Sequence, residues 1–276
     1  MFLKIERDQY GFQKTTVYDG NMKLISEQVS QTNQALATGY QILNSDIKLD
    51  KKRKIVQVRN STFYIPNYKK DLIQGCILDG NYFDIMNLDK MGKFLNKDSV
   101  VLDIGANIGN HTLYFANECH VKKIYSFEPI TETFKILKKN IKLNNLEDRV
   151  TIQNVGLSNE NTTGAIASFD EYNIGGTRLK HDNDGDIKLI TVDSLNIKEK
   201  IDFIKIDVEA MDDKVVLGAA ETIRKNLPVI AIESFAEEWE ITKPFLEKLG
   251  YKVEEELSCC EYILTPKKRK AKSKAL

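Results

Sequence analysis

The 276-residue sequence lacks several features that mark common classes of protein. It has no run of 18 apolar residues, so no transmembrane helix is expected. The charged start, Met1 to Asp8, has no apolar stretch of the kind found in a signal peptide. Lys+Arg and Asp+Glu both number 40, and this balance is atypical of a nucleic-acid-binding domain, which is usually basic. We therefore expect a cytoplasmic protein with no nucleic-acid partner.

Paired cysteines are lacking as well. The four cysteines contain no C-x-x-C spacing, and adjacent Cys259 and Cys260 would point to opposite faces of a strand. In a cytoplasmic protein, all four are expected to be reduced thiols. Hydrophobic residues make up 42% of the chain, which is enough for a sizeable core without disulfides.

The balanced charge hides a basic end. Residues 267–276 carry six cations, and the other 266 residues hold 34 basic and 40 acidic groups, a net charge of −6. Blocks of like charge are usually disordered and solvated, which is one interpretation of this tail. The other is a peripheral contact with an anionic glycan, a lipid surface or an acidic partner.

Residues 1–55 form a predicted N-terminal extension. Apolar or small residues recur every three or four positions from Met22 to Leu43, which indicates an amphipathic helix. That helix either packs on the body of the same chain or forms a homodimer. Beyond it, Ile55–Val58 and Thr62–Ile65 alternate around a turn and predict a small hairpin.

Residues 56–266 form the main predicted domain, in which strands and helices alternate from residue 99 onward. Apolar strands are expected at 100–105, 123–129, 150–158, 202–209 and 228–234, with helices at 110–119, 131–143, 213–224 and 237–249. A terminal strand pair follows, and residues 159–186 read as a long loop with room for a short hairpin. This pattern predicts an α/β fold: a mostly parallel sheet with helices on both faces and ligands at the carboxyl ends of the strands.

The turn after the first of these strands predicts a ligand site. Gly105 and Gly109 allow a sharp turn and a close approach of the backbone to a ligand. The spacing is G-x-x-x-G rather than the G-x-G-x-x-G of dinucleotide sites, and Asp103 precedes it. An amino-acid moiety fits better, with its carboxylate at the helix end and its ammonium near Asp103. The alternatives are that Asp103 caps the helix and that both glycines only form a turn.

Glu128 ends the second strand, 25 residues after Asp103. Doubly wound folds place the acid that accepts both ribose hydroxyls at about this point. No strongly basic residue follows that would hold a ribose phosphate. A ribose and a positively charged amino-acid tail describe S-adenosylmethionine, whereas a solvated strand end is the alternative for Glu128.

The segments DIGANIGNHTLYFA, FEP and IKIDVE, with their spacing, resemble FkbM-type S-adenosylmethionine-dependent methyltransferases over residues 63–235. The resemblance implies a Rossmann-like class I methyltransferase fold, whose seven-stranded sheet has an antiparallel last strand. It also implies methyl transfer, usually to a hydroxyl of a sugar or another secondary metabolite. The family usually has Gly after D-V-E, where this chain has Ala210. The predicted cofactor-binding residues are Asp103, Gly105, Ala106, Asn107, Gly109, Thr112 and Glu128.

Asp207 and Glu209 end the fourth strand and Glu233 ends the fifth. Strand alternation places Asp207 and Glu209 on one side, where carboxylates could act as a base, hold a sugar hydroxyl or bind a divalent cation. We assign catalysis to Asp207 and Glu209 and assign no metal. The alternative is that these acids cap helices or pair with Lys205 and Lys214.

The sequence thus predicts an O-methyltransferase that uses S-adenosylmethionine to methylate a hydroxyl of a surface glycan or its precursor. One alternative is an N- or O-methyltransferase of a small metabolite. Another is an interaction module that binds the cofactor without catalysis.

Overall fold

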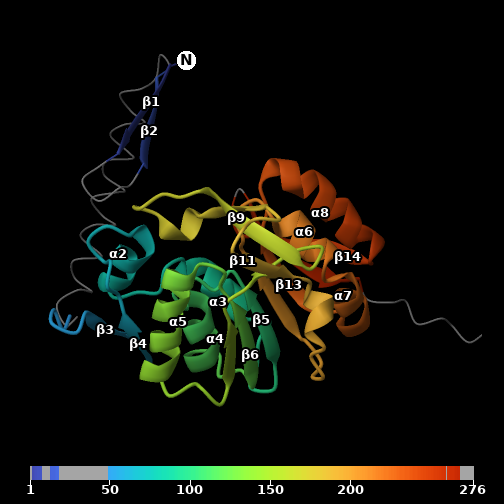
Figure 1. Cartoon of the computed structure of the whole chain (residues 1–276), viewed down its shortest axis with the longest axis horizontal. Coiled ribbons are helices and arrows are strands. Elements are labelled where there is room, and N and C mark those ends of the chain that lie inside the picture. Colours follow the sequence, from blue (N-terminus) through green and yellow to red (C-terminus); the bar gives the residue numbers. More distant parts are fainter. Residues whose placement is uncertain (1, 8–12, 19–48, 259, 268–276) are drawn as a thin grey trace, which may run out of the picture. The chain divides into compact units, whose positions relative to one another are not determined.

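A computed structural model describes residues 2–7, 13–18, 49–258 and 260–267 (Figure 1). The chain divides into two compact units, Met1–Phe83 with Asp170–Gly175, and Asp84–Phe169 with Gly176–Leu276. The division falls after Phe83, whereas the sequence-based domain starts at residue 56. The helix predicted at 22–43 and residues 268–276 of the basic tail lie outside the described residues. Among the described helices, none has the length and apolarity needed to span a bilayer.

The first unit contains two hairpins and a short helix. Strands β1 (Phe2–Arg7) and β2 (Gln13–Tyr18) pair antiparallel, within an extension for which the sequence predicted only a helix. Strands β3 (Ile55–Val58) and β4 (Ser61–Tyr64) form a second hairpin, which is the one that the sequence predicted.

Helix α2 (Leu72–Leu78) ties a distant piece of chain into the same unit. Its N-cap residue Asp71 accepts hydrogen bonds from the backbone N–H groups of Gln74, at 3.0 Å, and Ile174, at 3.1 Å. The N–H of Leu72 donates to the carbonyl of Tyr172 at 2.9 Å. The segment 170–175 therefore completes the start of α2 from about a hundred residues away.

The second unit is built on the seven-stranded sheet that the sequence predicted. Its strands are β5 (Val100–Ile104), β6 (Lys123–Phe127), β7 (Val150–Gln153), β12 (Phe203–Ile206), β13 (Val229–Glu233), β14 (Tyr251–Glu256) and β15 (Glu261–Pro266). They lie in the order β14-β15-β13-β12-β5-β6-β7, and β15 is antiparallel to both of its neighbours. The other neighbouring pairs are parallel, which confirms the class I methyltransferase arrangement.

Helices lie on both faces of this sheet, with α4 and α5 on one side and α6 and α8 on the other (Figure 1). The helices are α3 (Ile85–Gly92), α4 (Asn110–Asn117), α5 (Thr131–Leu143), α6 (Asp212–Leu217), α7 (Ala220–Asn226) and α8 (Ala236–Lys248). The single helix predicted at 213–224 is two helices in the structure. Gly218 separates them at a point where an added Cβ would lie 1.9 Å from the carbonyl oxygen of Ser158.

The region predicted as a long loop forms most of a second, four-stranded sheet. Its strands are β8 (Gly156–Leu157), β9 (Thr162–Ser168), β10 (Arg178–His181) and β11 (Ile187–Ile190), with 3₁₀ turns at Ile174–Gly176 and Val192–Leu195. Strand β9 pairs antiparallel with both β10 and β11, while β8 pairs parallel with β11. The short hairpin suggested by the sequence is thus part of a larger sheet.

The centre of the large sheet is buried on both faces, as its apolar strands predict. Every residue of β5 and β12 is buried. Phe203 on β12 meets Phe115 on α4 edge to face, with ring centroids 5.8 Å apart, and neither side chain is exposed to solvent. This packing fixes the strands whose carboxyl ends carry the polar residues described below.

Replacement of Phe203 by Ala should lower the free energy of unfolding by about 3–5 kcal/mol, because it leaves a cavity between β12 and α4. Chemical denaturation of the whole chain measures the loss. Ile166→Ala on β9 is the matched control, since that side chain is 47% exposed and should cost below about 0.5 kcal/mol. Equal losses in the two variants would contradict the assignment of Phe203 to the core.

Candidate active site

Three neighbouring strands end at one edge of the sheet and bring their following residues together. Ile206 of β12 lies opposite Ile104 of β5 and Ile232 of β13. The next residues, Gly105, Asp207 and Glu233, therefore lie at the same level, with Glu233 as the last residue of β13. This edge is where parallel α/β sheets bind their ligands.

The glycine loop, residues 105–109, follows β5 and is held between two strands. The backbone N–H groups of Gly105 and Ala106 donate to the carbonyl of Phe127, at 3.1 and 2.9 Å. Gly105 has φ +76°, and an added Cβ would lie 1.7 Å from the carbonyl oxygen of Asp207. The loop backbone therefore lies directly against the end of β12, and only glycine fits there.

Glu128 contacts the glycine loop at Asn107. One carboxylate oxygen accepts from the N–H of Asn107 at 2.9 Å, and the other accepts from the N–H of Ile130 at 2.8 Å. Burial raises the pKa of Glu128 to about 7, despite these two hydrogen bonds. Glu128 is therefore a buried group fixed by two backbone donors, rather than the solvated strand end that was its alternative.

Asp103 lies in the interior beneath the loop and has no exposed surface. It accepts a hydrogen bond from the hydroxyl of Thr112, which also bonds the hydroxyl of Ser126 at 2.9 Å. Asp103 does not cap α4, whose N-cap is Gly109. Asp103 and Thr112 thus connect β5 to the first turn of α4, and they support the loop from inside the protein.

Lys205 joins the loop to the strand ends, and its side chain is only 3% exposed. Its ammonium donates to the carbonyl of Gly105 at 2.8 Å and lies 3.1 Å from Asp207 and 3.6 Å from Asp103. Burial lowers its pKa, but the two carboxylates outweigh burial and raise it above the usual value. From the sequence, Lys205 was expected only as a possible ion-pair partner of the acids. A lysine inside an apolar strand is itself a signal of a buried ion pair, and this signal could have identified Lys205 as a site residue.

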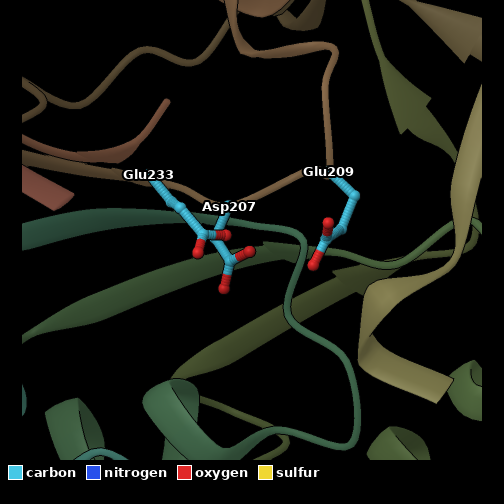
Figure 2. A group of neighbouring side chains, drawn as sticks. All are labelled: Asp207, Glu209 and Glu233. Carbon is cyan, nitrogen blue, oxygen red and sulfur yellow. The ribbon is translucent and has the colours of Figure 1, made fainter. Parts of the chain in front are cut away.

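Asp207, Glu209 and Glu233 form the carboxylate cluster. Each offers an oxygen, and these oxygens lie within 4.8 Å of one another. Figure 2 shows the three carboxyl groups pointing to the same side, with Asp207 between the other two. Carboxylate oxygens at this spacing are also the type of ligand that divalent cations prefer.

The three carboxyl groups of this cluster differ in proton affinity. Burial opposes ionisation of Asp207, but the charge of Lys205 outweighs it and lowers the pKa. Burial and the charge of Asp207 raise the pKa of Glu233 well above its usual range. The same two causes raise the pKa of Glu209 to about 7. The cluster therefore combines an ionised Asp207, a protonated Glu233 and a Glu209 that titrates near neutrality.

Glu209 reaches the cluster by a turn, which corrects the predicted strand alternation. Strand β12 ends at Ile206, whereas the sequence extended it to residue 209. Glu209 and Ala210 have φ of 52° and 67°, in the left-handed region. This conformation costs about 1–2 kcal/mol for a residue with a Cβ. Ala210 is therefore strained, at a position where FkbM-type methyltransferases usually have Gly.

Further ionisable residues surround the cluster and were missed in the sequence. Burial raises the pKa of Asp84, just before α3, and raises that of Glu261 on β15 to about 7. The side-chain amide of Asn87 donates to Glu261 at 2.5 Å. His111 is buried, and burial and Lys205 lower its pKa to about 4, so it is neutral and adds no positive charge. The site as a whole attracts cations.

Comparisons with known proteins find similarity over about half of the chain. The family described as Methyltransferase FkbM domain matches residues 103–253. A protein named Methyltransferase 1 from Beauveria bassiana (strain ARSEF 2860) is 25% identical over 139 residues, covering 49% of this chain and 55% of that protein. The AMB antimetabolite synthetase AmbE of Pseudomonas aeruginosa is 25% identical over 184 residues, covering 51% of this chain and 9% of that protein. The chain thus spans about half the length of the first and under a tenth of the second.

Among the solved structures that match, a methyltransferase FkbM from Methylobacillus flagellatus KT has 18% identity and a TM-score of 0.45, covering 62% of this chain and 44% of that one. The TYW2 protein of M. jannaschii in complex with AdoMet has 17% identity and a TM-score of 0.42, covering 76% of this chain and 82% of that one.

Replacement of Gly105 by Ala should lower the free energy of unfolding by about 2–4 kcal/mol, because the new methyl group overlaps the backbone of Asp207. Gly250→Ala is the control, since Gly250 has φ +90° and no atom within 4 Å of an added Cβ. It should show only the cost of the left-handed conformation, about 1–2 kcal/mol. Chemical denaturation distinguishes the two, and equal costs would argue against the contact with β12.

Proposed function

Because the chain belongs to the family of FkbM methyltransferase domains, we propose that it uses S-adenosylmethionine to methylate a hydroxyl group of a sugar or glycan. The observation that carries this proposal is the backbone contact between the glycine loop and Asp207. A ligand seated on the loop lies next to the carboxylate cluster. Binding and proton transfer can therefore take place at one edge of the sheet.

The residues present fit this cofactor. It carries two positive groups, a sulfonium and an ammonium, and the surrounding carboxylates provide the opposite charge. When bound, it supplies an electrophilic methyl group, which the acceptor oxygen attacks as the carbon–sulfur bond breaks and S-adenosylhomocysteine leaves. Glu128 would hold the ribose hydroxyls. The other residues proposed to form or support the binding site are Asp103, Gly105, Ala106, Asn107, Gly109 and Thr112.

Glu209 is the better candidate for the base that takes the acceptor's hydroxyl proton. Asp207 is held ionised by Lys205, so it binds a proton weakly and is suited to orienting a hydroxyl. Glu209 is half-buried with a pKa of about 7, which matches a base that works near neutral pH. We assign proton removal to Glu209 and orientation of the acceptor to Asp207.

A second candidate acceptor is an amine, and the excess of carboxylates favours it because a cationic amine is attracted to the same cluster. Incubation with labelled cofactor and a panel of glycans, amino sugars and small amines separates the two. Label on a sugar oxygen supports the first proposal, and label on nitrogen supports the second. Cofactor binding without transfer to any acceptor would indicate the non-catalytic module.

Glu128→Gln should weaken binding of S-adenosylmethionine by about 1–3 kcal/mol, because an amide cannot accept hydrogen bonds with both of its terminal atoms. Isothermal titration calorimetry measures the change. Glu132→Gln on the exposed first turn of α5 is the control and should bind as the natural chain does. Unchanged affinity in Glu128→Gln would remove Glu128 from the cofactor site.

The pH dependence of kcat/KM should report the ionisation of Glu209. The base accepts a proton only when ionised, so kcat/KM should fall about tenfold per pH unit below pH 7 and level off above it. Glu209→Gln should lower the rate about 10²–10⁴-fold and abolish this acidic limb. An unchanged limb in that variant would assign the titration to another group.

A further inference from the structure

Arg178 brings a positive charge to the edge of the carboxylate cluster. It is the first residue of β10, an edge strand of the four-stranded sheet. Its guanidinium carbon lies 5.5 Å from the ring centroid of Phe235, the N-cap residue of α8. Phe235 follows Glu233 by two residues, so this contact joins the small sheet to the end of β13.

The guanidinium of Arg178 is exposed and has no hydrogen bond or ion pair among the described residues. Its charge is nonetheless felt at Glu209, where it favours the ionised carboxylate. Other cations nearby are already paired, since Lys180 lies 3.4 Å from Asp182 and Lys205 lies 3.1 Å from Asp207. Arg178 is therefore a charged group with free donors, positioned beside the proposed base.

We propose that Arg178 binds a carboxylate or phosphate group of the methyl acceptor, which makes the acceptor an acidic or phosphorylated sugar. This inference rests on the proposed function, because it assigns the substrate of the same site. A guanidinium presents several N–H donors to such anions and can bind them through two hydrogen bonds. The Phe235 ring restrains the side chain, which reduces the conformational entropy lost when an anion binds.

The surrounding charges would give an anionic acceptor one orientation. Its acidic group is repelled by the ionised Asp207 and attracted by Arg178, so it lies at the outer edge of the site. A hydroxyl on the same sugar then faces Glu209. Neutral sugars lack the charge that strengthens a hydrogen bond from Arg178, so this residue acts on specificity and positioning, while Glu209 takes the proton.

The test measures binding to the full chain saturated with S-adenosylhomocysteine. Three probes are titrated by calorimetry: methyl glucuronide, glucose 1-phosphate and the neutral methyl glucoside. We expect at least one anionic probe to bind about tenfold or more tightly than the neutral one, on the scale of a charge-assisted hydrogen bond. Arg178→Gln should abolish the difference, while Arg178→Lys, which keeps the charge, should retain part of it.

Arg224→Gln on α7 is the matched control, because Arg224 is an exposed arginine that pairs with Glu221. It should leave the preference unchanged. The anionic probe that loses affinity in Arg178→Gln identifies a carboxylate or a phosphate as the group recognised. Absence of any anionic preference in the natural chain, or a preference that survives Arg178→Gln, would overturn the proposal.

The same experiment distinguishes this inference from the proposed function. Titrations are repeated without S-adenosylhomocysteine, so that the anion preference is measured even if the chain does not bind that compound. Methyl transfer is assayed as well. An anion preference that depends on Arg178, in a chain that transfers no methyl group, would leave the anion site standing and refute the enzyme activity. Transfer to neutral sugars at the same rate in Arg178→Gln, without any anion preference, would refute only the anion site.

Discussion

The buried ammonium of Lys205 is the interaction on which the rest of the site depends. It bonds the carbonyl of Gly105 and lies between Asp103 and Asp207, so one charge connects the glycine loop to the end of β12. Without it, the buried Asp103 and the partly buried Asp207 would both lose their compensating charge. The proposed cofactor loop and Asp207 are therefore not independent features, because the same cation contacts both.

The carboxyl groups that Lys205 does not pair bear on the chemistry proposed for the site. Glu209, Glu233 and Glu261 lie in a partly dry environment, where burial and mutual repulsion raise their pKa values. A cationic ligand relieves that repulsion, which favours a sulfonium compound over a pyrophosphate. Arg178 extends the pattern at the outer edge of the cluster, where a positive group would select the opposite charge on an acceptor.

The large sheet could be predicted because strands buried on both faces appear in the sequence as continuous apolar runs. The glycine loop was predictable because Gly105 and Gly109 mark a sharp turn between an apolar strand and the helix that follows it. Strand alternation correctly predicted that Glu209 lies on the same side as Asp207, but the reason was wrong. Strand β12 ends at Ile206, and a turn in the left-handed conformation brings Glu209 to Asp207. Local patterns could not reveal Asp84 or Glu261, because only the folded chain brings these residues together with Asp207.

The segment 170–175 has a consequence for synthesis of the protein. Its bonds to Asp71 and Leu72 complete the start of α2, yet residues 84–169 of the other unit lie between them in the chain. At about 5–20 residues per second, a translating ribosome needs several seconds or more to deliver that stretch. Asp71 and Leu72 therefore lack these two partners until residues 170–175 have left the exit tunnel.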